Sequence, residues 1–202
     1  MKKISLIVAL LSLAIGTIYA QESILSQTPQ TDSAYRLPLE KGIIVSANEL
    51  SPLAYGIAQH FNSVDFCAWE FITSKPSAVC AARGGKVEFA DDNCVIVLHD
   101  DGTYAEYTKL DQVCVAAGSQ LSRGDILAQA SLSPLSGKWK VRMAVYYHKP
   151  NPAYGGEGRS SQYKTLMHYI NPVFSTKGKC KVMLIDGNTY IVRSRTWCWP
   201  WE

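Results

Sequence analysis

Two segments in the middle of the chain constrain its fold more than any other feature. Residues 79–89 read V-C-A-A-R-G-G-K-V-E-F, and residues 94–110 read C-V-I-V-L-H-D-D-G-T-Y-A-E-Y-T-K-L. Both alternate and are rich in Val, Ile, Phe and Tyr, which predicts β-strands. Asp100-Asp101-Gly102 lies between Val95–Leu98 and Thr103–Tyr107, and glycine supplies the positive φ that a tight hairpin turn needs. The centre of the chain therefore predicts an antiparallel β-sheet.

A third segment extends this pattern. Residues 115–127 space glycine and leucine three residues apart, at Gly118, Leu121, Gly124 and Leu127. This spacing indicates a strand that turns a tight corner over an apolar core. With 202 residues, the chain is long enough for one domain with a sizeable core. We therefore expect a mainly β protein.

The first residues have the pattern of an export signal. Met1–Lys3 is basic, and Ile4–Ile18 is an apolar run that ends shortly before Ala20. This order is typical of a secretory signal peptide cleaved after Ala20. An uncleaved membrane anchor is the alternative, but the run is short for a bilayer span. We expect a periplasmic or secreted protein, with residues 1–20 as signal peptide, residues 21–34 as a flexible leader, and no membrane contact after cleavage.

The charge balance excludes one class of partner. Residues 1–20 hold Lys2 and Lys3 and no acidic residue, so 18 basic and 17 acidic residues remain, a formal net charge of +1. Nucleic-acid binding domains are usually strongly basic, and this chain is too balanced to be one. We expect no nucleic-acid partner.

The cysteines predict a disulfide framework. All six follow the predicted signal peptide: Cys67, Cys80, Cys94, Cys114, Cys180 and Cys198. An even number in an exported protein favours disulfides over the alternative, a metal held by the first four. Six cysteines allow about 15 connectivities, and we predict the pairs Cys67–Cys80, Cys94–Cys114 and Cys180–Cys198. For the last pair, a hairpin around Asp186-Gly187-Asn188 would bring its ends together.

Three segments resemble the β-core of lysostaphin-type zinc endopeptidases, enzymes that cut peptide cross-links in bacterial cell walls. Ala78–Val87, Ile96–Leu110 and Val115–Leu127 match the family patterns P-V-x-A-A-x-x-G-x-V, I-x-H-x-D-G-x-Y-x-x-Y-x-H-L and V-x-x-G-x-x-V-x-x-G-x-x-I. The resemblance implies a lysostaphin-type antiparallel β-sheet core, of duplicated hybrid-motif or barrel-sandwich type, over residues 35–150. Residues 151–202 are then a C-terminal extension with a small β-hairpin.

The same resemblance assigns a site that this chain has altered. In the family, the motif H-x-x-x-D binds zinc; here Asp65 matches its Asp, and His60 lies five residues before it instead of four. The two histidines of H-L-H-F-E-V align with Lys140 and Arg142, and the histidine of Y-x-H-L aligns with Lys109. These five positions form a vestigial site, in which we expect no catalytic residue and no metal.

The chemistry of the replacements explains this expectation. Arginine keeps its proton at working pH and cannot ligate zinc, while lysine ligates only after a costly deprotonation. We hypothesise that Arg142 takes the place of the metal and pairs with Asp65. In the alternative, His60 and Asp65 recruit another histidine, such as His148 or His168, and rescue a zinc site.

These observations predict a catalytically inactive, exported peptidase-like domain without a cofactor. It would bind cell-wall peptide or a periplasmic or secreted protein, and it could regulate a cell-wall hydrolase. Lys109, Lys140 and Arg142 could hold an anionic group of peptidoglycan, or they could form a solvated charged face. The alternatives are an active zinc endopeptidase with rearranged ligands, and a purely structural or interaction module without affinity for peptidoglycan.

Overall fold

The computed structural model describes residues 30–31, 34–50, 68–148 and 167–192. Within these ranges the regular structure consists of β-strands, and no helix is present that could cross a membrane. The predicted signal peptide and most of the leader lie outside them, as does the predicted boundary at residue 150. The expectation of a mainly β protein is confirmed for the part of the chain that the structure describes.

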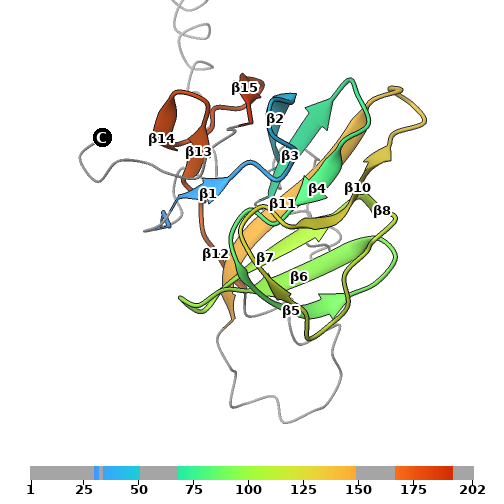
Figure 1. The fold of residues 1–202 in the computed structure, drawn as a ribbon. Helices are drawn as coiled ribbons and strands as arrows, with labels where there is room; N and C mark the ends of the chain where they lie inside the picture. The colour runs from blue at the N-terminus through green and yellow to red at the C-terminus, as the bar shows by residue number, and fades with distance from the viewer. Residues whose placement is uncertain (1–29, 32–33, 51–67, 149–166, 193–202) are drawn as a thin grey trace, which may run out of the picture.

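One large sheet dominates the fold (Figure 1). Its main path runs in the order β15–β2–β3–β11–β7–β6–β5–β9, and each of these neighbouring pairs is antiparallel. The strands on this path are β2 (Ile44–Leu50), β3 (Ala68–Thr73), β5 (Gly85–Ala90), β6 (Cys94–Leu98), β7 (Thr103–Thr108), β9 (Gln120–Leu121), β11 (Trp139–His148) and β15 (Thr189–Ile191). Four more strands extend the sheet from this path. β10 (Ile126–Leu132) and β12 (Met167–Tyr169) pair with β11, and β4 (Ala78–Cys80) and β8 (Leu110–Asp111) pair with β10.

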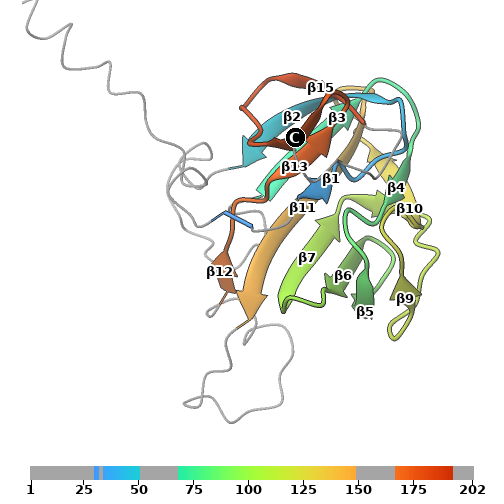
Figure 2. The same cartoon turned by 60° about the vertical axis from the view of Figure 1, so that its left-hand side comes forward.

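A second, three-stranded sheet joins the two ends of the described chain (Figure 2). It contains β1 (Tyr35–Arg36), β13 (Phe174–Thr176) and β14 (Lys179–Val182). β1 pairs with β13 in parallel, and β13 pairs with β14 in an antiparallel hairpin. The expected small C-terminal hairpin is therefore present.

Side chains alternate along a strand, so β11 contributes residues to both faces of the large sheet. Val141, Met143 and Val145 point into the core and are fully buried. The core also contains side chains from both sheets, including Tyr35, Trp69, Phe71, Val95, Val97, Tyr107 and Phe174. Lys140, Arg142, Ala144 and Tyr146 occupy the other face of β11, which we call the outer face.

The tight turns that were predicted from Gly102, Gly118 and Gly124 are present in the structure. The turn between β6 and β7 contains Gly102 at a φ of 79°, and Gly118 and Gly124, beside β9, have φ values of 90° and 101°. The hairpin predicted around Asp186-Gly187-Asn188 is wrong in its partner, because β15 pairs with β2 and β14 pairs with β13. Local turn residues do not determine which distant strand a segment joins.

Two predicted disulfides are also wrong. Cys80, Cys94 and Cys114 are free cysteines, which excludes the pairs Cys67–Cys80 and Cys94–Cys114. The Cys114 thiol lies 3.5 Å from the carbonyl oxygen of Ile126, and the Cys94 thiol faces Glu106. Cys180 is disulfide-bonded. Cys67 and Cys198 lie outside the described residues, so the pair Cys180–Cys198 stays a prediction.

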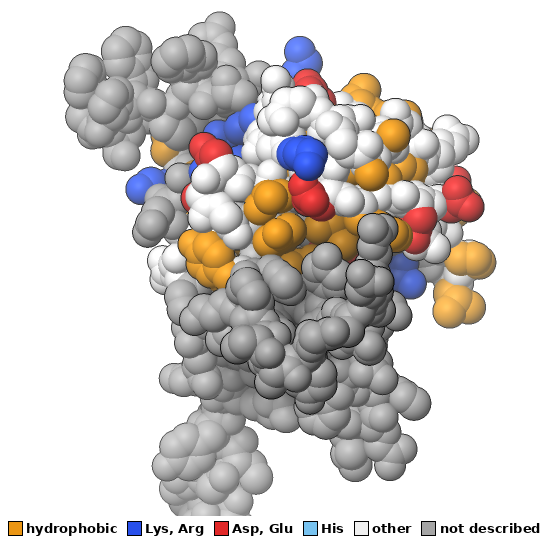
Figure 3. Space-filling view, turned by 90° about the horizontal axis from the view of Figure 1, so that it is seen from below, with side chains coloured by type: hydrophobic (Ala, Val, Ile, Leu, Met, Phe, Trp, Pro, Cys, Tyr) orange, Lys and Arg blue, Asp and Glu red, His pale blue; other side chains and the backbone are white. Residues whose placement is uncertain are grey.

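Some large apolar side chains remain at the surface. Ile44 and Ile191, which pair across β2 and β15, are 62% and 38% exposed. Viewed from below, further hydrophobic side chains gather beside charged ones (Figure 3). Single exposed apolar side chains such as Ile44 and Ile191 are ordinary on protein surfaces.

Gly85 provides a test of the packing between β5 and β6. A Cβ atom at this position would lie 2.9 Å from Val97 Cγ1 and 3.0 Å from His99 Nδ1, and still closer to the backbone oxygen of Leu98. Because backbone cannot move aside cheaply, we expect Gly85→Ala to lower the free energy of unfolding by about 1–3 kcal/mol. Lys86→Ala, at an exposed neighbour, should change it by less than about 0.5 kcal/mol. Urea titrations that give equal values for the two variants would contradict this packing.

Candidate functional site

The register of the sheet brings distant residues into one row on the outer face. Asn48 on β2 lies opposite Glu70 on β3, Glu70 opposite Arg142 on β11, and Arg142 opposite Thr108 on β7. Thr108 lies opposite Cys94 on β6. Five strands thus contribute to a row of mostly polar side chains in the centre of the sheet.

Glu70 is the centre of this row. Its side chain is 7% exposed, and its two carboxylate oxygens accept from two different cations. Lys140 Nζ lies 3.2 Å from Oε1, and Arg142 Nε lies 2.9 Å from Oε2. A buried carboxylate requires such partners because transfer from water costs several kcal/mol. Lys140 and Arg142 are therefore engaged in neutralising a buried anion.

A second buried carboxylate lies one row further along the sheet. Glu106 on β7 pairs with Ala144 on β11, and the hydroxyl of Tyr146 donates to its Oε2 over 3.2 Å. The thiol of Cys94 lies 3.8 Å from Oε1. Burial, followed by the charge of Glu106, raises the pKa of Cys94 well above its usual range. This cysteine stays protonated at neutral pH and is unsuited to act as a nucleophile.

The outer face becomes apolar beyond Glu106. Leu50, Ala68, Ala144 and Tyr146 form a small buried cluster, against which Tyr104 packs. The rings of Tyr104 and Tyr146 stack with centroids 5.7 Å apart and planes 7° apart. The polar row and this cluster lie side by side on the same strands.

The structure brings together the side chains of two of the five predicted site residues, and it links a third to them through its backbone. Lys140 and Arg142 share Glu70. Lys109 is linked to them through Ser131 on β10: the Ser131 amide donates to the Lys109 carbonyl over 3.1 Å, and Ser131 pairs with Lys140 on β11. Lys109 is exposed and has a φ of 60°, in the left-handed region that non-glycine residues rarely adopt. His60 and Asp65 lie outside the described residues, so pairing of Arg142 with Asp65 stays a hypothesis.

Sequence analysis missed Glu70 and Glu106. Both are single carboxylates in otherwise apolar strands, A-W-E-F-I-T and T-Y-A-E-Y-T. A lone acid in a segment that is otherwise apolar or aromatic is the available signal, since such a residue is rarely buried without a partner. Its partner could not be named without the strand order.

The described part of this site does not fit a zinc ion. A hydrolytic zinc needs three protein ligands that offer lone pairs, such as histidine nitrogen or carboxylate oxygen. Lys140 and Arg142 instead present cationic groups, and both oxygens of Glu70 are occupied by them. Among the described residues, no group of three or more His, Cys, Asp or Glu side chains lies close enough to hold a metal.

Comparison with known proteins agrees with the predicted resemblance. Residues 68–152, from the start of β3 to just past β11, match the family model described as Peptidase family M23. This match confirms the similarity to lysostaphin-type peptidases for that segment, which includes the altered positions at Lys109, Lys140 and Arg142. No curated protein matches the chain.

Solved structures with a similar fold include a metalloprotease, lysostaphin and a pore-forming complex. The M23 metalloprotease pseudoalterin from the deep sea is 13% identical, with 81% of this chain and 100% of that chain covered and a TM-score of 0.47. A pore-forming SpoIIQ–SpoIIIAH complex is 14% identical over 58% and 85%, with a TM-score of 0.42. Lysostaphin in solution is 16% identical over 57% and 45%, with a TM-score of 0.40. Similarities this distant do not assign an activity to this chain.

The Glu70 network makes a prediction for stability. Glu70→Gln would remove the negative charge and leave Lys140 and Arg142 facing a neutral amide in a part-buried position. We expect the free energy of unfolding to fall by about 3 kcal/mol. Glu88→Gln, which removes an exposed carboxylate paired with Lys86, should change it by less than about 1 kcal/mol. Denaturant titrations in which both variants match the wild type would refute the network's structural role.

Proposed function

We propose that the chain is an exported, catalytically inactive peptidase-like domain that binds cell-wall peptide or a protein of the cell envelope through the outer face of its sheet. The observation that carries this proposal is the capture of Lys140 and Arg142 by Glu70. These cations stand at two positions where the family resemblance places histidines. Fold and activity are separable, and a peptidase-like sheet can serve as a binding module.

The chemistry supports loss of hydrolysis. Zinc peptidases depend on a metal that polarises the scissile carbonyl and lowers the pKa of a bound water. Arg142 cannot give up its proton, and its guanidinium already donates to Glu70. A dication placed beside Lys140 and Arg142 would be repelled by two cations that share the single carboxylate of Glu70.

The arrangement also supports binding. Two side chains of the outer face remain partly accessible: Lys140, whose side chain is 27% exposed although it pairs with Glu70, and Tyr104, which stacks on the buried Tyr146. Polar groups beside an apolar floor are the usual composition of a site for an extended peptide. Export rests on the N-terminal pattern of the sequence, and it would place the domain in the compartment that holds such ligands.

A paired assay tests the proposal. Purified peptidoglycan sacculi are incubated with the full chain, and pelleted protein and released fragments are measured on the same sample. We expect the protein to sediment with the sacculi while no fragments are released. Lys140→Gln should weaken sedimentation several-fold, whereas Lys86→Gln, on an exposed part of β5, should leave it unchanged.

Two results would contradict this function in different ways. Release of peptide fragments would favour an active endopeptidase with rearranged ligands. Absence of both release and sedimentation would favour a structural or protein-interaction module without affinity for the cell wall.

A further inference from the structure

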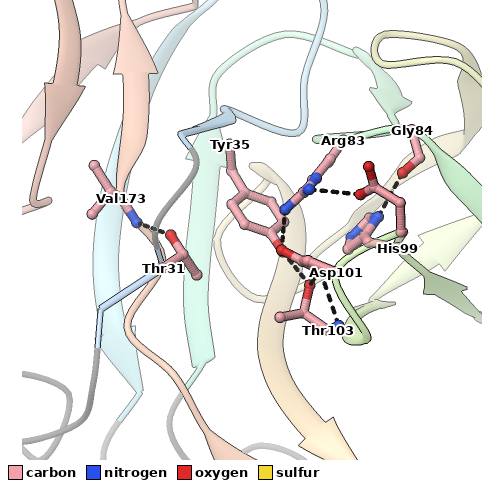
Figure 4. Close-up of polar contacts among 9 residues, drawn as sticks. Thr31, Tyr35, Arg83, Gly84, His99, Asp101, Thr103 and Val173 are labelled. Atoms are coloured by element: carbon pink, nitrogen blue, oxygen red, sulfur yellow. Dashed lines mark hydrogen bonds and ion pairs between the residues drawn. The ribbon is translucent and has the colours of Figure 1, made fainter.

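A polar cluster ties the first described strand to the tip of the β6–β7 hairpin (Figure 4). The hydroxyl of Tyr35, on β1, lies 2.8 Å from Thr103 Oγ1, at the start of β7. Thr103 Oγ1 in turn lies 2.6 Å from Asp101 Oδ1. Because a carboxylate only accepts, the Thr103 hydroxyl donates to Asp101, and Tyr35 must donate to Thr103. Burial raises the pKa of Tyr35 to about 12, so this donor keeps its proton.

Arg83 closes the cluster from the turn between β4 and β5. Its guanidinium forms ion pairs with Asp101 and, over 2.6 Å, with Asp100. Its Cζ atom lies 6.0 Å from the centre of the Tyr35 ring. Burial alone would raise the pKa of Asp101, but hydrogen bonds from Thr103 and the charge of Arg83 hold it below the usual value. Asp101 therefore stays ionised at neutral pH.

His99 lies beneath the cluster and is 3% exposed. Its Nδ1 atom lies 2.8 Å from the carbonyl oxygen of Gly84, and a carbonyl only accepts, so Nδ1 carries the proton. Its Nε2 atom is buried and has no hydrogen-bond partner in the described part of the chain. The ring meets that of Tyr35 edge to face, with centroids 5.4 Å apart. A protonated His99 would bury a second N–H without an acceptor.

We propose that His99 makes this cluster a pH-sensitive latch, which holds β1 on the β6–β7 hairpin at neutral pH and releases it on acidification. Release would separate Tyr35 from Thr103 and loosen β13, because β1 contributes only two residues to their parallel pair. The Tyr35 amide donates to the carbonyl of Val173, and the Val173 amide donates to Thr31 Oγ1. The latch therefore couples the N-terminal segment to the C-terminal hairpin.

The direction of the effect follows from the groups that face His99. Burial lowers the pKa of its imidazole, and Arg83 lowers it further, while the Gly84 carbonyl, Asp101 and Asp100 act in the opposite direction. Tyr35, the remaining titratable group in contact, is neutral throughout the range of interest. With the folded pKa below the unfolded value of about 6.5, stabilisation by neutral His99 is complete above that pH and is lost as the pH falls toward the folded pKa.

Hydrogen exchange on the full chain tests the latch. We expect the protection factors of the Tyr35 and Arg36 amides, corrected for intrinsic rates, to fall up to about tenfold per pH unit below about pH 6.5. Amides of β11, in the centre of the sheet, should keep higher protection factors at each pH, because local release of β1 needs less free energy than global unfolding. His99→Asn, which retains a donor for Gly84 but does not titrate in this range, should abolish the fall in β1. Thr103→Val should lower protection of β1 at every pH while keeping the wild-type slope.

Three outcomes would overturn the proposal. Protection of β1 that does not change with pH would exclude a switch. Equal protection factors for β1 and β11 of the wild type at acidic pH would indicate global unfolding instead of local release, and this comparison needs no variant. An unchanged pH dependence in His99→Asn would assign the titration to another group.

Discussion

A carboxylate buried between β-strands must find partners that offset its lost hydration, and this requirement organises the outer face of the sheet. Glu70 meets it with Lys140 and Arg142, which lie two residues apart on the neighbouring strand and therefore point the same way. Removing one partner of such an arrangement is far more costly than replacing all of it, so the three residues act as a unit. Glu70, Lys140 and Arg142 are therefore already paired with one another in the absence of a ligand.

The pairing of Glu70 with Lys140 and Arg142 links the fold to the proposed loss of hydrolysis. The segment that matches Peptidase family M23 supplies the strands that carry Lys140 and Arg142, and these residues present cations where the predicted alignment has histidines. The sheet keeps its register because the core face of β11, with Val141, Met143 and Val145, is independent of what the outer face carries. Alternation along a strand allows one face to change chemistry while the other preserves the architecture.

Features encoded locally could be predicted from sequence. Alternation and the Asp100-Asp101-Gly102 turn give β6, β7 and their hairpin, and the glycines around residues 118–124 give the corner before β10. Features that depend on long-range register could not. The partner of β15, the free state of Cys80, Cys94 and Cys114, and the ion pairs of Glu70 all depend on which strands become neighbours. Aligning Lys140 and Arg142 with family histidines predicted an altered site, but it did not predict the carboxylate that holds them.

The latch around His99 is separate from the outer face. His99 directly follows β6 and lies on its core side, since Val97 and Val95, two and four residues earlier, are core residues, whereas Cys94 faces Glu106. Changes at the latch should therefore alter how the two chain ends are held without altering the Glu70 network. The two features can be studied independently in the same protein.

The most direct test of the central claim is the metal content of the full chain, purified without added metal and without chelators, by inductively coupled plasma mass spectrometry. If Lys140 and Arg142 have displaced the metal site, zinc should be far below one ion per chain, and dialysis against zinc should not raise it. A content of about one zinc per chain would contradict this account and would show that other residues complete a metal site.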